Sequence, residues 1–185
     1  MTPLGALGSR LEERLRSRAA TVGVVGLGYV GLPLAVAFAR AGFQVIGVDA
    51  DPARTTRLAG GMSPVEDVPA AELAPLVQSG RLAIHSAPDA LGEADAIVIC
   101  VPTPLGKSKE PDIYFIVAAA DGVARVLRLG TLVVLESTTY PGTTDEVLLP
   151  GGVTRVCRHL IETLYRQIID RVVPGSSTQA AEMAR

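Results

Sequence analysis

The sequence predicts an α/β fold built on a doubly wound, mostly parallel sheet, with a C-terminal helix–strand–helix appendage. Apolar segments of strand length alternate with helix-length segments from residue 22 to residue 135. Two of the strand segments, 95–101 and 131–135, are almost continuously apolar, which is typical of parallel strands buried on both faces. The first strand, 22–25, runs into a G-x-G-x-x-G turn at 26–31 that opens a helix. This pattern indicates a Rossmann-type sheet, which binds ligands at the carboxyl ends of its strands.

The expected elements follow in order along the chain. A charged, helix-prone lead-in at 11–20 precedes the first strand. The helix after the glycine turn tolerates Pro33, because a helix's first turn needs no hydrogen bond from that position. Gly60 and Gly61 end the next helix. We expect strands at 22–25, 44–48, 81–85, 95–101 and 131–135, and helices at 30–41, 52–59, 70–78 and 113–129.

The pattern changes after Pro150. Apolar residues at positions 153, 156, 160, 164 and 168 are spaced three or four apart, which predicts one amphipathic helix packed on the sheet domain. A short strand at 171–173 and an N-cap cluster at 176–178 follow, and a last helix begins there. The chain therefore divides into a lead-in helix at 1–21, a nucleotide-binding domain at 22–150 and a C-terminal part of that domain at 151–185.

The glycine turn predicts a bound dinucleotide. Gly26 lets the chain turn sharply, Gly28 leaves the backbone open to a pyrophosphate, and Gly31 lets the helix pack closely on the strand. The second strand ends at Asp49, 21 residues after Gly28, where a carboxylate is expected to bind the ribose hydroxyls of NAD. An acid at this place repels a 2′-phosphate, so NAD is favoured over NADP. The alternative is a glycine-rich connection with no ligand.

Composition limits the function classes. The 185 residues amount to about one domain, and 48% hydrophobic with 19% charged residues suits a buried core. A net charge of −2 gives no reason to expect nucleic acid or an anionic membrane as a partner. The uncharged run 19–39 is split by the glycine turn and Pro33, so we expect no membrane span.

The mixed charge of the first residues is unlike a signal peptide, which predicts a cytoplasmic location. Cys100 and Cys157 are then expected to be thiols, and no metal site is expected.

Two further loops at strand ends carry polar groups suited to a nucleotide. The first, C-V-P-T-P-L at 100–105, combines two prolines with the uncharged hydroxyl of Thr103. The second, E-S-T-T-Y-P-G-T-T at 136–144, is rich in hydroxyls that suit ribose, a nicotinamide amide or a water. Taken alone, each loop fits equally well a turn whose Ser and Thr only cap the next helix.

Together these loops resemble the UDP-glucose/GDP-mannose dehydrogenase family, the nucleotide-sugar 6-dehydrogenases. The matching segments are V-G-L-G-Y-V-G-L-P-L-A, G-V-D-A-D-P-A-R, C-V-P-T-P-L, K-E-P-D and E-S-T-T-Y-P-G-T-T. The last two look most like members that act on UDP-N-acetylhexosamines. The resemblance covers about 22–150 and resumes over 151–185. It implies NAD-dependent oxidation of the sugar C6 alcohol to a carboxylate, with a nucleotide sugar as substrate and homo-oligomers in the family.

The resemblance also implies roles for individual residues. The glycine turn would hold the pyrophosphate, Asp49 the adenosine ribose, and Arg54 would lie along the adenosine, unless Arg54 is only a solvated helix charge. Thr138 matches a threonine that helps position a catalytic water, and is the one catalytic residue we expect. Glu136 is left out of the expected site. The expected cofactor-binding residues are Gly26, Gly28, Tyr29, Val30, Gly31, Asp49, Arg54, Val101, Pro102, Thr103, Pro104, Ser137 and Thr138.

The chain departs from the family pattern on the catalytic side. Family members continue after the threonine loop with a segment that contains an S-P-E motif. Here Pro150 is followed directly by residues that resemble a later segment of the family sequence. Arg185 stands where a catalytic lysine is usual, and neither Cys100 nor Cys157 matches the family's nucleophilic cysteine. We therefore expect this chain alone to be inactive and to dimerise weakly or not at all. The alternative function is a catalytically silent NAD-binding module; the β-hydroxyacid dehydrogenases are a weaker match.

Overall fold

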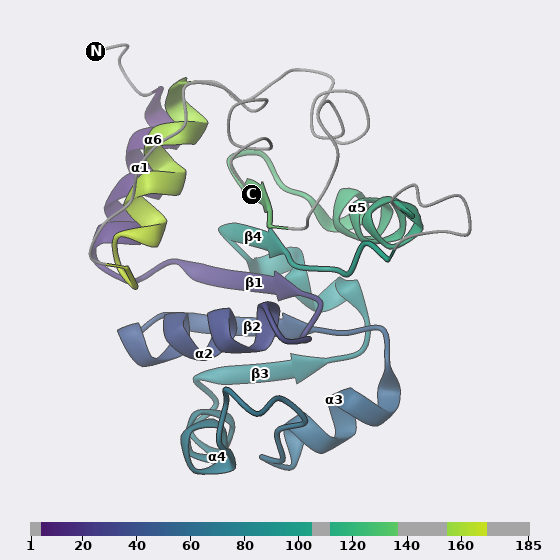
Figure 1. The fold of residues 1–185 in the computed structure, drawn as a ribbon. Coiled ribbons are helices and arrows are strands. Elements are labelled where there is room, and N and C mark those ends of the chain that lie inside the picture. The colour runs from purple at the N-terminus through teal and green to yellow at the C-terminus, as the bar shows by residue number, and fades with distance from the viewer. Residues whose placement is uncertain (1–4, 105–111, 137–154, 170–185) are drawn as a thin grey trace.

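Five parallel strands form the sheet of the described residues, in the order β3-β2-β1-β4-β5 (Figure 1). The computed structural model describes residues 5–104, 112–136 and 155–169. The strand order reverses between β1 and β4, so the chain winds outward from the centre in both directions. This confirms the doubly wound parallel sheet. The strands are β1 (Thr21–Val25), β2 (Gln44–Val48), β3 (Leu82–His85), β4 (Ala96–Ile99) and β5 (Leu132–Leu135).

The carboxyl ends of the central strands are level. Val25, the last residue of β1, is paired with Val48 of β2 on one side and with Ile99 of β4 on the other. Ile99 is in turn paired with Leu135, the last residue of β5. The segments that leave these strands therefore start along one edge of the sheet, where a doubly wound fold places its ligands.

Helices cover both faces of the sheet. Alternate strand residues point to opposite faces. Val24 and Val98 join the larger core with α1, α2 and α6, whereas Ile97 and Ile99 join a second core with η1 and α5. The helices are α1 (Ala6–Arg16), α2 (Gly31–Ala41), α3 (Pro52–Ala59), α4 (Ala70–Gln78), the 3₁₀ helix η1 (Pro88–Glu93), α5 (Tyr114–Val126) and α6 (Arg155–Tyr165).

The lead-in helix lies earlier in the chain than predicted. It spans Ala6–Arg16 rather than 11–20. Two features end it: the Ser17 hydroxyl donates to the carbonyl of Glu13 at 2.8 Å, and Arg18 adopts a left-handed conformation with φ of 59°. The apolar residues Leu11 and Leu15 were correctly placed in this helix, and both are buried.

Other boundaries differ by a few residues. The predicted helix 113–129 ends at Val126, because Leu127 adopts an extended conformation with ψ of 131°. The predicted strand 95–101 is shortened to Ala96–Ile99. The predicted helix 153–168 is found as Arg155–Tyr165, and it packs on the domain as expected through the buried Leu160 and Leu164. The predicted strand at 171–173, the last helix and the junction after Pro150 lie outside the described residues.

The helices α1 and α6 lie side by side, although they come from opposite ends of the chain (Figure 1). Glu12 of α1 accepts hydrogen bonds from Arg16 and lies 3.0 Å from Nε2 of His159 on α6. The hydrogen bonds with His159 and with Arg16 lower the pKa of Glu12 below its ordinary value. On the other side of α1, Arg14 pairs with Asp95 at 2.7 Å. The helix α6 is thus tied to the sheet domain by apolar packing and to α1 by the contact of His159 with Glu12.

The uncharged run 19–39 folds as β1, the glycine turn and most of α2. Across the three described segments, every helix is too short or too polar to cross a bilayer. The same segments bring no three metal-ligating side chains together.

Candidate cofactor-binding site

The glycine turn between β1 and α2 is packed closely against the strand beside it. Gly26 has a φ of +90°, and a Cβ on it would lie 2.8 Å from the carbonyl oxygen of Cys100. A Cβ on Gly31 would lie 1.8 Å from the carbonyl oxygen of Gly26. Glycine is required at both positions by the protein itself, since any side chain would collide with backbone atoms. The predicted sharp turn and close helix–strand packing are confirmed.

Gly28 is different, because the protein does not account for its lack of a side chain. A Cβ on Gly28 would have no protein atom within 4 Å, and its φ lies outside the left-handed region. The residue faces the cavity at the strand ends, next to the amino end of α2. A backbone that is open at this point, beside a helix amino end, fits the approach of a phosphate group.

Asp49 ties the end of β2 to two neighbouring segments. The residue is only 6% exposed. Its Oδ2 accepts from the amide of Leu27 at 2.8 Å and from Nη1 of Arg54 at 2.9 Å, and its Oδ1 accepts from the amide of Asp51 at 2.9 Å. A carboxylate has about four acceptor positions, so three protein donors leave room for one hydroxyl of a ligand.

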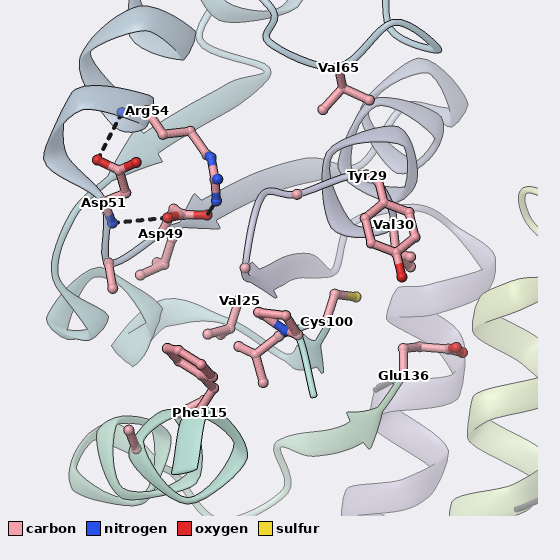
Figure 2. Close-up of a pocket in the computed structure, with 18 of the residues that line it drawn as sticks. Val25, Tyr29, Val30, Asp49, Asp51, Arg54, Val65, Cys100, Phe115 and Glu136 are labelled. Atoms are coloured by element: carbon pink, nitrogen blue, oxygen red, sulfur yellow. Dashed lines mark hydrogen bonds and ion pairs between the residues drawn. The ribbon is translucent and has the colours of Figure 1, made fainter. Parts of the chain in front are cut away.

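Arg54 is not a solvated helix charge. It projects from the first turn of α3 back to Asp49, and its side chain lines the same cavity (Figure 2). The helix is started by Asp51, whose Oδ1 accepts from the amides of Ala53 and Arg54, and by Pro52 at the first helical position. The D-A-D-P-A-R segment therefore places one guanidinium directly over the ribose-binding carboxylate that the sequence predicts.

A cavity of about 930 Å³ lies at the carboxyl ends of the strands and brings most of the predicted residues together. Tyr29 is 76% exposed, and it stands with Val30 at one side of this cavity (Figure 2). The predicted residues that line it are Gly26, Gly28, Tyr29, Val30, Asp49, Arg54, Val101, Pro102 and Thr103.

Of the four remaining predicted residues, two have other positions and two lie outside the described residues. Gly31 lies beneath the turn, against Gly26 and Cys100, and is not among the lining residues. Pro104 follows the lining residue Thr103, and its carbonyl accepts from the amide of Asp112 at 2.8 Å. Ser137 and Thr138 lie outside the described residues.

The wall that α5 contributes to the cavity was not predicted from the sequence. Phe115 and a stripe of small residues on α5 face the cavity. The signal was present in the sequence, because Phe115, Ala118, Ala119 and Gly122 recur at helical spacing and lie on one face. Close packing favours glycine at position 122, because a Cβ there would lie 2.9 Å from the ring of Pro88 on η1.

Glu136 also lines the cavity, although it was left out of the predicted site. It follows the last residue of β5, and its amide donates to the carbonyl of Ile99 at 2.8 Å. Its Oε1 accepts from the hydroxyl of Tyr165 on α6 at 2.7 Å. The partner is 29 residues away in another helix, so no spacing rule could have paired the two.

Comparison with known proteins found a matching family and several relatives. The model of the UDP-glucose/GDP-mannose dehydrogenase family, NAD binding domain, matches residues 20–155. The chain is 39% identical over 129 residues to the UDP-N-acetyl-D-glucosamine 6-dehydrogenase of Pseudomonas aeruginosa, covering 70% of this chain and 30% of that protein. It is 43% identical over 129 residues to the UDP-N-acetyl-D-mannosamine dehydrogenase of Escherichia coli K12, covering 69% and 30%.

Solved structures show the same architecture. The UDP-N-acetyl-mannosamine dehydrogenase of Staphylococcus aureus superposes with a TM-score of 0.80 at 26% identity, over 89% of this chain and 49% of that one. This chain therefore spans about a third of the length of the curated relatives and about half of the solved one.

Proposed function

Because the chain belongs to the UDP-glucose/GDP-mannose dehydrogenase family, we propose that it supplies the NAD-binding part of an enzyme that oxidises a nucleotide sugar. The cofactor of this family domain is NAD. The proposed reaction takes the C6 alcohol of a UDP-hexose or UDP-N-acetylhexosamine to the carboxylate. Relatives named for UDP-N-acetyl-D-glucosamine and UDP-N-acetyl-D-mannosamine support the N-acetylated substrates.

The observation that carries this proposal is the open backbone at Gly28. The other two glycines of the turn are required by contacts within the protein, whereas Gly28 meets nothing within 4 Å. Its setting, between the strand ends and the amino end of α2, favours an anion through the helix dipole and the amide groups. The cavity of about 930 Å³ is near the upper end of the roughly 300–1,000 Å³ that ligand pockets occupy.

In this proposal, different residues of the chain bind different parts of NAD. Gly26, Gly28 and the amino end of α2 bind the pyrophosphate, while Asp49 accepts a ribose hydroxyl with its remaining acceptor position. Arg54 keeps Asp49 in place and covers the adenosine side. Residues 101–103 form the facing wall. The chemistry that NAD supplies when bound is acceptance of a hydride from the sugar carbon.

The roles of Ser137 and Thr138 rest on the resemblance of their loop to the family. They would face the nicotinamide, and Thr138 would help to position a catalytic water. The loop begins with Glu136, which lies at the cavity. Assembly into homo-oligomers is likewise proposed only from the family.

A second candidate function is an NAD-binding module without turnover. It is favoured by the sequence around Pro150, which passes directly to Gly151-Gly152 where the family has an S-P-E segment. Oxidation of an aldehyde through a thioester also needs a nucleophilic cysteine, and neither Cys100 nor Cys157 is in a matching motif.

The 185-residue polypeptide is expected to bind NAD but to form no NADH from UDP-glucose or UDP-N-acetylhexosamines. The reason is that the S-P-E glutamate and the cysteine motif are not among these residues, so acid–base and covalent help are lacking. NADH absorbance measures the result. Robust turnover that survives both Cys100→Ser and Cys157→Ser would show that the chemistry proceeds without them.

A further inference from the structure

The turn from β2 into α3 holds two aspartates that are joined through the backbone. Asp49 follows the strand, and its Oδ1 accepts from the amide of Asp51 at 2.9 Å. Asp51 caps the helix, because its Oδ1 accepts from the amides of Ala53 at 2.9 Å and of Arg54 at 3.3 Å. Figure 2 shows Asp49, Asp51 and Arg54 together at one end of the cavity, and all three line it.

The amino end of α3 is closed by the protein's own acceptors. Free amides at the start of a helix are the groups that commonly bind phosphate. Here the amides of Ala53 and Arg54 are both taken by the side chain of Asp51. The amide of Thr55 donates to the carbonyl of Asp51 at 3.0 Å, and Pro52 has no amide hydrogen. A phosphate at this helix end would therefore find every one of these donors occupied.

The guanidinium of Arg54 is engaged as well. Its Nη1 lies 2.9 Å from Oδ2 of Asp49, and Arg54 is the one cation among the lining residues that the structure describes. A phosphate entering this end would have to compete with Asp49 for the guanidinium. The remaining charged groups of the lining are all carboxylates, namely Asp49, Asp51, Glu66, Asp67 and Glu136.

We propose that Asp51 is a second residue that makes this pocket select NAD over NADP, by closing the amino end of α3 to the 2′-phosphate. The two cofactors differ only in that phosphate, which NADP carries on the adenosine ribose. The ribose is bound by the acid at the end of β2, so the phosphate would project among Asp49 and its hydrogen-bonded neighbours. With Asp51 in place it meets a carboxylate where two amides would otherwise point.

This inference rests on the proposed function, because it needs the adenosine to lie at the end of β2. It adds to the selectivity expected of Asp49 and concerns a different group. Asp49 acts on the ribose itself, whereas Asp51 acts by occupying the donors of the neighbouring helix. Contacts to the nicotinamide and the pyrophosphate are common to both cofactors and cancel in the ratio of their dissociation constants.

The test is to titrate the wild-type chain and an Asp51→Gly variant with NAD and with NADP. Glycine costs only a little at the position before a helix, so α3 is expected to remain folded. The variant frees the amides of Ala53 and Arg54 and removes one negative charge. The ratio of the NADP to the NAD dissociation constant is expected to fall about tenfold, through tighter NADP binding.

Two matched variants separate the occupied amides from charge. Asp51→Asn removes the charge but keeps an oxygen that caps the helix, since asparagine caps as well as aspartate. It is expected to lower the ratio only about threefold. Asp67→Asn removes a carboxylate that also lines the cavity but does not cap α3. It is expected to leave the ratio unchanged.

The outcomes separate this inference from the proposed function. If Asp51→Gly binds NAD and keeps the wild-type ratio, the inference is wrong and the proposed function stands. The inference is also wrong if Asp51→Asn lowers the ratio as far as Asp51→Gly, because charge alone would then explain the selectivity. The same holds if Asp67→Asn does so, because the acidity of the whole cavity would then be responsible.

Two further results bear on the wild-type chain and on folding. If the folded wild-type chain binds neither cofactor, the proposed function and this inference both fail. Circular dichroism and thermal unfolding check that each variant is folded. Should Asp51→Gly not fold, Asp51→Asn decides the matter, and a wild-type ratio in that variant would overturn the inference.

Discussion

Gly28→Val is expected to weaken NAD binding roughly 100-fold or more while the protein remains folded. The branched side chain would occupy the place where the pyrophosphate meets the backbone. The protein itself has room for it, because a Cβ at Gly28 meets no protein atom within 4 Å and the φ is not left-handed. Calorimetric titration with NAD measures the loss, and circular dichroism with thermal unfolding checks the fold.

Gly92→Val is the matched control for this change. Gly92 also has no protein atom within 4 Å of a Cβ, but it lies on η1 and does not line the cavity. Its valine variant is expected to bind NAD as the wild type does. If Gly28→Val bound NAD with wild-type affinity, the glycine turn would only connect β1 to α2 and would not bind the pyrophosphate.

Asp49→Asn is expected to reduce the preference for NAD over NADP by at least about fivefold. In the wild type, the carboxylate of Asp49 repels a 2′-phosphate at a cost on the order of 1–4 kcal/mol, and it also engages the guanidinium of Arg54. Neutral asparagine removes the repulsion and leaves Arg54 to pair with the phosphate, as an arginine does in NADP-binding relatives of this fold. Parallel titrations with NAD and NADP give the ratio.

Stability must be followed in this variant, since asparagine replaces one acceptor oxygen by a donor. One of the amides of Leu27 and Asp51 then lacks its acceptor, at a cost of about 1–3 kcal/mol. Glu136→Gln serves as the control for selectivity, because it removes a charge at the far end of the cavity and should not change the NAD to NADP ratio. An unchanged ratio in Asp49→Asn would mean that Asp49 does not select the cofactor.

Local chemistry explains why some elements could be predicted to the residue. The helix α3 begins after Asp51, whose side chain caps it, and it ends at Gly60. The helix α2 ends at Gly42, which has a left-handed φ of 105°. Such signals lie in adjacent residues, so sequence suffices to place them.

Boundaries without such signals were less well predicted. Leu127 and Leu129 extend the apolar pattern of α5, but the backbone leaves the helix after Val126, and Leu129 is 90% exposed. Apolar spacing reports which residues could be buried in a helix and not where the helix stops. The lead-in helix was misplaced for the same reason, because its end depends on the conformation of Arg18.

The candidate site divides in the same way. The glycine turn and Asp49 follow from spacing along the chain, and the structure places them at one cavity. The contacts of Glu136 with Tyr165 and of Glu12 with His159 join residues 29 and 147 positions apart. They depend on how α6 packs against the sheet domain and α1, which no local pattern encodes.

Calorimetric titration of the wild-type chain with NAD, and separately with NADP, tests the central claim most directly. We expect saturable binding of one NAD per chain, with NADP at least about fivefold weaker because of the charge of Asp49. Absence of saturable NAD binding by the folded chain, or NADP binding of equal or greater strength, would contradict the account.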